Sequence, residues 1–230
     1  MNIISQKENA LREQGFAFYG KITASLSHEL NNVIAIINEY NGLLNDLLIG
    51  AKQGVPIDDK KLQKISKKNS IQLERGKELV DKLNKFAHSS DNAAAEIDIS
   101  EILQAIIALT QRLAGLKEIN LEFKALTEPI KLVNNPFCFQ HAVFTCFEMF
   151  IANDDISRSI IVSAEKIESM VIIKISGSEL SDNAFNQTKK SILEMLLEQL
   201  NGSYRITAGD GGRQIIILTI DRKADTKHIS

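Results

Sequence analysis

Apolar residues recur near the start of the chain in alternating steps of four and three, the spacing of a coiled-coil seam. This pattern predicts one long helix over residues 5–49, with the seam formed by Leu26, Leu30, Val33, Ile37, Tyr40, Leu44 and Leu47. Two glycines and a proline interrupt the pattern within residues 50–57. Asp58 can then cap a second helix over residues 59–88, whose apolar face includes Leu62, Ile65, Leu73, Val80, Leu83 and Phe86.

Two long amphipathic helices joined by a short loop predict an antiparallel helical hairpin. A single hairpin cannot cover the apolar surface of both helices. Pairing of two copies covers that surface and makes a four-helix bundle, so we expect a homodimer.

The pattern changes after a polar linker at residues 89–95. Shorter helices are predicted over 101–116, with Ser100 as the cap, over 136–152 and over 187–200. Strands are predicted over 119–126, 130–133, 160–164, 170–176, 204–207 and 214–220. Helices interleaved with antiparallel strand pairs predict an α/β sandwich, so the fold class is α+β. We expect two domains, residues 1–92 and residues 93–230.

Composition narrows the classes of partner. The formal net charge of −2 provides no basic field for nucleic acid or an anionic membrane. The N-terminus lacks the apolar core of a secretory signal, and no apolar run approaches the ~20 residues that span a bilayer. We therefore expect a cytoplasmic protein. Cys138 and Cys146 are expected to be free thiols, and no cysteine–histidine spacing predicts a metal site.

One histidine lies outside the predicted seam. His28 falls at heptad position f, so it faces solvent or a docking partner, and Asn32 lies four residues later on the same face. A neutral imidazole is a good nucleophile near pH 7, and a neighbouring carboxylate such as Glu29 can accept its Nδ1 proton while Nε2 attacks phosphorus. The spacing alone also fits a surface histidine without a chemical role.

Residues 27–32 read Ser-His-Glu-Leu-Asn-Asn. This run, within a long helix that opens a hairpin, resembles the phosphoacceptor motif of two-component sensor histidine kinases, which reads His-Glu-x-x-Asn in many members. The resemblance implies that His28 is the phosphorylation site, that Glu29 is the acid–base residue, and that Asn32 serves in autokinase or phosphatase chemistry.

The order of elements after residue 97 is similar to the ATP-binding domain of the same kinases, but the nucleotide motifs of that family are missing. Residues 139–150 contain no asparagine at the magnesium-binding position, and residues 176–180 read Ser-Gly-Ser-Glu-Leu where the family has its adenine-contacting loop. Residues 177–187 are too short for a nucleotide lid, and the helix that follows opens without glycine. We therefore expect no bound cofactor and no resident metal.

Taken together, the chain looks like the dimeric histidine phosphotransferases that descended from kinases. The resemblance implies that receiver domains of response regulators are its partners. Each receiver supplies its own aspartates and Mg²⁺. Three alternatives stay open: a receiver phosphatase or pseudokinase regulator that uses Asn32, a kinase with atypical ATP binding, and a dimeric scaffold in which His28 is incidental.

Overall fold

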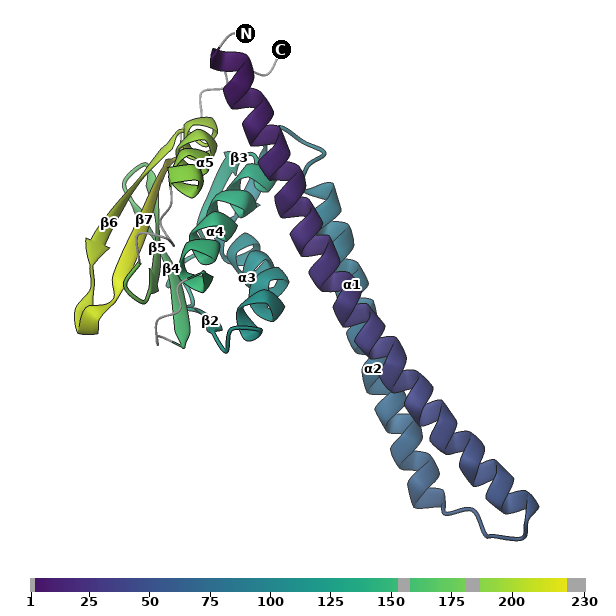
Figure 1. Cartoon of the computed structure of the whole chain (residues 1–230). Helices are drawn as coiled ribbons and strands as arrows, with labels where there is room; N and C mark the ends of the chain where they lie inside the picture. Colours follow the sequence, from purple (N-terminus) through teal and green to yellow (C-terminus); the bar gives the residue numbers. More distant parts are fainter. Residues whose placement is uncertain (1–2, 153–157, 181–186, 223–230) are drawn as a thin grey trace. The chain divides into compact units, whose positions relative to one another are not determined.

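The chain folds as an α+β protein, as its hydrophobic pattern predicts (Figure 1). The structure is a computed structural model that describes residues 3–152, 158–180 and 187–222. Two compact units divide the chain, one formed by residues 23–85 and the other by residues 1–22 together with 86–230. The sequence pattern predicts a boundary between independently folding domains at residue 92. The two units do not test that boundary, so it stays a prediction.

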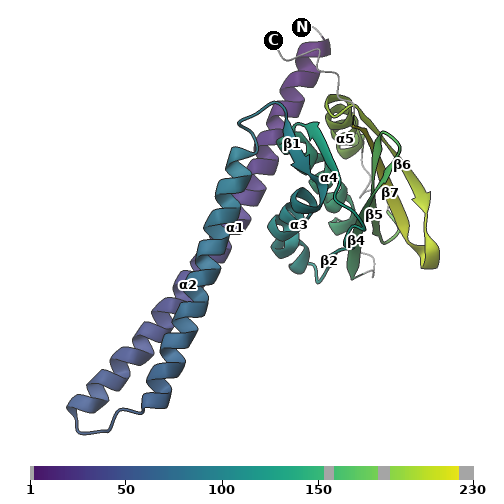
Figure 2. The same ribbon diagram turned by 180° about the vertical axis from the view of Figure 1, so that it is seen from behind.

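The unit of residues 23–85 is a helical hairpin. Helix α1 (Ile3–Lys52) runs antiparallel to α2 (Asp59–His88), and the two lie side by side in both ribbon views (Figures 1 and 2). In the turn between them, Gly54 has a φ of +86°, which favours glycine. The predicted cap is confirmed, because Asp58 Oδ1 accepts a hydrogen bond of 2.9 Å from the backbone N–H of Lys60.

The seam between the two helices follows the predicted register on α1, where Leu26 and Val33 are buried. On α2 the predicted apolar face divides, because Leu73 and Val80 are 61% and 43% exposed and do not face α1. Helix α2 carries two apolar stripes, and the stripe that faces α1 includes the buried Ile65, Leu79 and Phe86. Polar or small residues complete that face, namely Asn69, Gln72 and Gly76.

The other unit contains a five-stranded sheet with helices on one face (Figures 1 and 2). Its strand order is β2 (Asn120–Phe123), β4 (Ser159–Ile167), β5 (Met170–Gly177), β7 (Gln214–Asp221) and β6 (Gly202–Ala208). The covering helices are α3 (Ile99–Gly115), α4 (Pro136–Ile151) and α5 (Gln187–Gln199). A second sheet pairs β1 (Ala95–Asp98) with β3 (Lys131–Asn134), and a short 3-10 turn, η1 (Asp210–Gly212), joins β6 to β7.

Strand pairing departs from the expected antiparallel pairs in two places. Strand β2 runs parallel to β4, and β3 pairs not with β2 but with β1, a strand that the sequence pattern did not predict. The cap of α3 also differs: Asp98, not Ser100, accepts hydrogen bonds from the backbone N–H groups of Ser100 and Glu101. A carboxylate at the end of β1 therefore starts the helix two residues earlier than expected.

The core of this unit lies between α4 and the sheet. Helix α4 contributes buried aromatic rings, and β5 alternates buried and partly exposed residues as a strand with one covered face does. Most of the apolar run of residues 142–151 is therefore core. The first turns of α1 belong to the same unit through Phe18, whose ring lies 5.3 Å from that of Phe86 and 4.8 Å from that of Phe144.

None of the helices within the described residues combines the length and the apolar character that crossing a membrane requires.

Candidate functional site

His28 lies on α1 with its side chain exposed, while Ser25 and Leu26, less than one turn earlier, are buried. The predicted outward orientation of this histidine is therefore confirmed. Asn32 is also exposed, one turn further along the same helix. An imidazole and an amide thus share a solvent-facing side of the hairpin, where a macromolecular partner can reach both.

Glu29 lies beside the histidine and is held from the second helix. Arg75 Nη2 of α2 donates to Glu29 Oε2 at 3.4 Å, and the Glu29 side chain is only 19% exposed. An ion pair at such partial exposure contributes little to stability, typically less than about 1 kcal/mol. Its structural effect is to restrict the carboxylate next to His28 to a limited set of positions.

The close approach of the two helices brings Arg75 within reach of Glu29. The neighbour of Arg75 on α2 is Gly76, and a Cβ built there would lie 3.3 Å from Cγ1 of Val33. Val33 is buried, and it follows Asn32 directly. The absence of a side chain at Gly76 therefore lets α1 and α2 pack tightly at the level of the candidate site.

The histidine of α4 lies inside the protein. His141 is 5% exposed and stacks on the ring of Phe18, with ring centroids 4.7 Å apart. Burial, with a smaller contribution from the charge of Lys21, lowers the pKa of His141 to about 4. This ring is a neutral member of an aromatic cluster and not a site residue. Cys138 and Cys146 are free, as expected, and burial raises the pKa of Cys138 to about 11.

Two lysines contact Glu148 on α4. Glu148, near the end of α4, pairs with Lys21 Nζ of α1, and the backbone carbonyl of Glu148 accepts a hydrogen bond of 3.1 Å from Lys189 Nζ of α5. Burial lowers the pKa of Lys189. Part of the predicted short connection, residues 181–186, lies outside the described residues.

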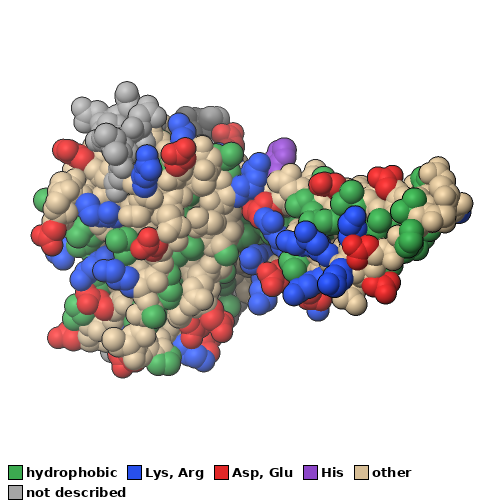
Figure 3. Space-filling model, turned by 90° about the horizontal axis from the view of Figure 1, so that it is seen from below, with side chains coloured by type: hydrophobic (Ala, Val, Ile, Leu, Met, Phe, Trp, Pro, Cys, Tyr) green, Lys and Arg blue, Asp and Glu red, His purple; other side chains and the backbone are tan. Residues whose placement is uncertain are grey.

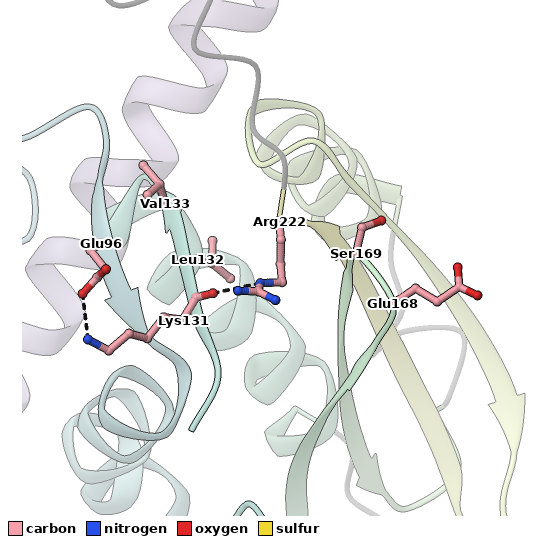
Figure 4. A pocket seen from close by; sticks show the side chains of 7 residues that line it. All are labelled: Glu96, Lys131, Leu132, Val133, Glu168, Ser169 and Arg222. Atoms are coloured by element: carbon pink, nitrogen blue, oxygen red, sulfur yellow. Dashed lines mark hydrogen bonds and ion pairs between the residues drawn. The ribbon is translucent and has the colours of Figure 1, made fainter. Parts of the chain in front are cut away.

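The part of the chain that the structure describes contains no group of three His, Cys, Asp or Glu side chains placed to hold a metal ion. A hollow of about 600 Å³ opens between β3 and the turn after β4 (Figure 4). Its cations already have partners: Lys131 Nζ pairs with Glu96 at 2.8 Å, and Arg222 Nε donates to the carbonyl of Lys131 at 3.0 Å. We therefore do not consider it the functional site.

The three residues predicted from sequence, His28, Glu29 and Asn32, lie within two turns of one helix. The structure adds Arg75, which is 46 residues away from Glu29 in the chain. No local sequence pattern points to Arg75, because its pairing with Glu29 depends on which face of α2 turns toward α1.

The chain thus combines a helical hairpin that carries an exposed histidine with an α/β sandwich. No family model and no curated protein sequence matches the chain. Among solved structures, the Acinetobacter baumannii histidine kinase AdeS is similar, with 14% identity, coverage of 85% of this chain and 98% of that chain, and a TM-score of 0.47.

Two further solved structures resemble the chain. The histidine kinase ThkA in complex with the response regulator protein TrrA matches with 16% identity, 95% of this chain, 66% of that chain and a TM-score of 0.48. The ATP binding domain of PrrB from Mycobacterium tuberculosis matches with 13% identity, 57% of this chain, 98% of that chain and a TM-score of 0.49. At these values the similarity extends no further than the general arrangement of elements, so the function must be argued from this chain's own residues.

Proposed function

We propose that the chain is a histidine phosphotransferase of two-component signalling, in which His28 accepts a phosphoryl group from the aspartate of a receiver domain and passes it to another receiver. The observation that carries this proposal is the exposed imidazole of His28 beside Glu29, a carboxylate that Arg75 holds from the neighbouring helix. An exposed nucleophile suits a donor that is itself a protein, because a receiver must bring its phosphoaspartate to within bonding distance of the ring.

The transfer balances without a further reactant. The Nε2 lone pair of neutral His28 attacks the phosphorus, a nitrogen–phosphorus bond forms, and the phosphorus–oxygen bond to the donor aspartate breaks, which leaves a free carboxylate. The Nδ1 proton passes to a carboxylate, the role proposed for Glu29. Return of the proton and attack by the aspartate of a second receiver reverse the step. The receiver supplies Mg²⁺, which neutralises charge on the transferred group.

The surface of the hairpin supports pairing with a second copy. Leu73 and Val80 of α2 are exposed and seven residues apart, and Ile34 and Leu48 of α1 are 54% and 47% exposed and fourteen residues apart. Apolar residues repeated at heptad spacing on an exposed helix face are typical of a bundle interface. If this surface forms the homodimer, an Ile34→Glu, Leu73→Glu variant should be monomeric in light scattering while its helix content stays unchanged.

The second domain is proposed to act as an interface and not as a kinase. This is supported by the contacts of Glu148 with Lys21 and Lys189, and by the packing of Phe150 against Gly177 at the end of β5. Titration with ATP and Mg²⁺ tests it directly. Micromolar affinity would show that the domain binds nucleotide, and a kinase with atypical ATP binding would then be the better description.

Incubation of the chain with phosphorylated receiver domains from the same genome tests the proposed transfer. We expect acid-labile phosphate on the wild-type chain and none on His28→Ala, with an unchanged circular dichroism spectrum. His88→Ala is a matched control, because His88 is also an exposed histidine at a helix surface. If no receiver in the full set phosphorylates His28, the chain is not a phosphotransferase, and an incidental histidine on a scaffold remains.

Asn32 favours a second candidate, a phosphatase of a receiver, because its exposed amide shares the side of α1 that carries His28. An amide can orient the water that attacks a phosphoaspartate. Asn32→Ala and His28→Ala separate the two functions: a phosphatase loses activity in the first variant and keeps it in the second, whereas a phosphotransferase loses transfer in the second.

A further inference from the structure

Five lysines occur within ten residues at the start of α2, with a single acidic residue among them. All five are exposed, and none forms an ion pair with another described residue. They are Lys60, Lys61, Lys64, Lys67 and Lys68. Lys and Arg side chains gather over the hairpin in the space-filling view (Figure 3). In a protein of net charge −2, such a concentration of unpaired positive charge is a local feature and not a result of composition.

Three of these lysines continue a row that reaches the candidate site. Lys60, Lys64 and Lys67 follow helical spacing, and the same row continues through Ile71 to Arg75, the residue that holds Glu29 beside His28. We call this row of five residues, Lys60, Lys64, Lys67, Ile71 and Arg75, the lysine face. The contact of Arg75 with Glu29 places the row on the same side of the hairpin as Glu29. Leu73 and Val80 belong to the other exposed stripe of α2.

The lysine face includes a hollow with apolar content. A depression of about 450 Å³ is lined by residues of α2 that include Lys67, Ile71 and Arg75. Ile71 is 49% exposed, so an apolar side chain lies among the charges. Glu74 and Glu78 also line the depression. A surface of both signs around an exposed apolar residue fits a folded protein better than the uniform negative charge of nucleic acid or lipid headgroups.

The dimensions fit one docked domain. At 1.5 Å of rise per residue, Lys67 lies about 12 Å and Lys60 about 22 Å along α2 from Arg75. A domain of about 100 residues has a radius of gyration of about 13 Å, so it can touch His28 and the whole lysine face at once.

We propose that the lysine face is the docking surface for a receiver domain whose contact area is acidic around an apolar side chain, and that its positive charge selects such receivers. The proposal rests on the proposed function, because it concerns the partner that exchanges phosphoryl groups with His28. A receiver that handles Mg²⁺ and phosphoaspartate carries carboxylates around its site, which complements this surface. Exposed charges act mainly on the association rate, and salt screens them over about 8–10 Å.

The experiment uses the full chain and the purified receiver domains of the same genome, phosphorylated with acetyl phosphate. The test variant is Lys60→Gln, Lys64→Gln, Lys67→Gln, because glutamine preserves helix propensity. The control changes three exposed lysines elsewhere to glutamine, namely Lys52, Lys77 and Lys124. Both variants have the same net charge. Association rates are measured at about 50 mM and about 300 mM salt, where screening differs strongly.

For the receiver that the wild-type chain binds fastest, we expect the association rate at low salt to fall by about tenfold or more in the test variant. The control should stay within about twofold, and the difference should shrink at high salt. Equal rates in the test variant, or an equal loss in the control, overturn the proposal. Binding of no receiver also overturns it, as does lysine-dependent binding of duplex DNA or phosphatidylserine vesicles in place of receivers.

Phosphate on His28 is measured in the same reactions, so the two proposals fail separately. Transfer that proceeds at the wild-type rate in the test variant leaves the proposed function standing and removes the docking surface. Lysine-dependent binding without phosphate on His28 leaves the docking surface standing and removes the proposed function.

Discussion

Gly177→Ala tests how tightly the end of β5 packs against α4. A Cβ built at Gly177 would lie 2.4 Å from Cδ1, 2.6 Å from Cγ and 2.8 Å from Cε1 of Phe150. The Phe150 ring is only 2% exposed, so it has no free space into which to turn.

The expected cost follows from overpacking. An extra methyl group forced into a well-packed core costs typically 1–3 kcal/mol, and three ring atoms within 3 Å place this case in the upper part of that range. We therefore expect Gly177→Ala to lower the free energy of unfolding by about 2–3 kcal/mol. Phe150→Leu creates room at the same place, so the two substitutions should couple by about 1 kcal/mol or more.

Urea unfolding followed by far-UV circular dichroism measures both quantities. Gly20→Ala is the matched control, since no other atom lies within 4 Å of the added Cβ and alanine is the better helix former by about 1 kcal/mol. That variant should be as stable as the wild type or more so. An unchanged unfolding free energy in Gly177→Ala, or strict additivity with Phe150→Leu, would refute the packing described here.

Three further variants probe other contacts. Burial holds the pKa of His141 at about 4, against 6.5 in the unfolded chain. The free energy of unfolding should therefore fall by up to about 3 kcal/mol as pH drops through this range. Urea titrations should show a smaller fall in His141→Phe. Asp98→Ala removes the side chain that caps α3 and should cost about 1 kcal/mol in the same unfolding assay. Arg75→Ala frees Glu29, so it should slow phosphorylation of His28 by about tenfold at unchanged stability. Lys77 is an exposed cation on the same helix, and Lys77→Ala should leave the rate unchanged.

Elements with strong local signals were predicted well. The helices at 136–152 and 187–200 differ from α4 and α5 by a single residue at the C-terminal end, because Pro136 and the Asn-Gly pair at 201–202 mark the boundaries. Strand pairing was predicted less well. The parallel pairing of β2 with β4 and the β1–β3 sheet join segments more than 30 residues apart, and local patterns carry no information on such partners.

The candidate site was likewise predicted only in part from local patterns. The exposure of His28 follows from the heptad register of α1, which local spacing reveals. The contact of Arg75 with Glu29 does not, because α2 carries two apolar stripes and the sequence pattern does not say which of them faces α1. Packing decided the register: the stripe containing Gly76 allows the closer approach of the helices.

If the hairpin pairs with a second copy as proposed, helix geometry still leaves its histidine exposed. His28 and Ile34 are six residues apart, which at about 100° per residue separates them by about 120° around the axis of α1. A bundle formed through the stripe of Ile34 therefore leaves the His28 side open. Pairing through the His28 side would instead cover the imidazole and leave Ile34, Leu73 and Val80 in water, at a loss of roughly 1.5–3 kcal/mol of burial for each. Of the two arrangements, the proposed dimer through the stripe of Ile34 is thus the one that buries more apolar surface and leaves His28 exposed.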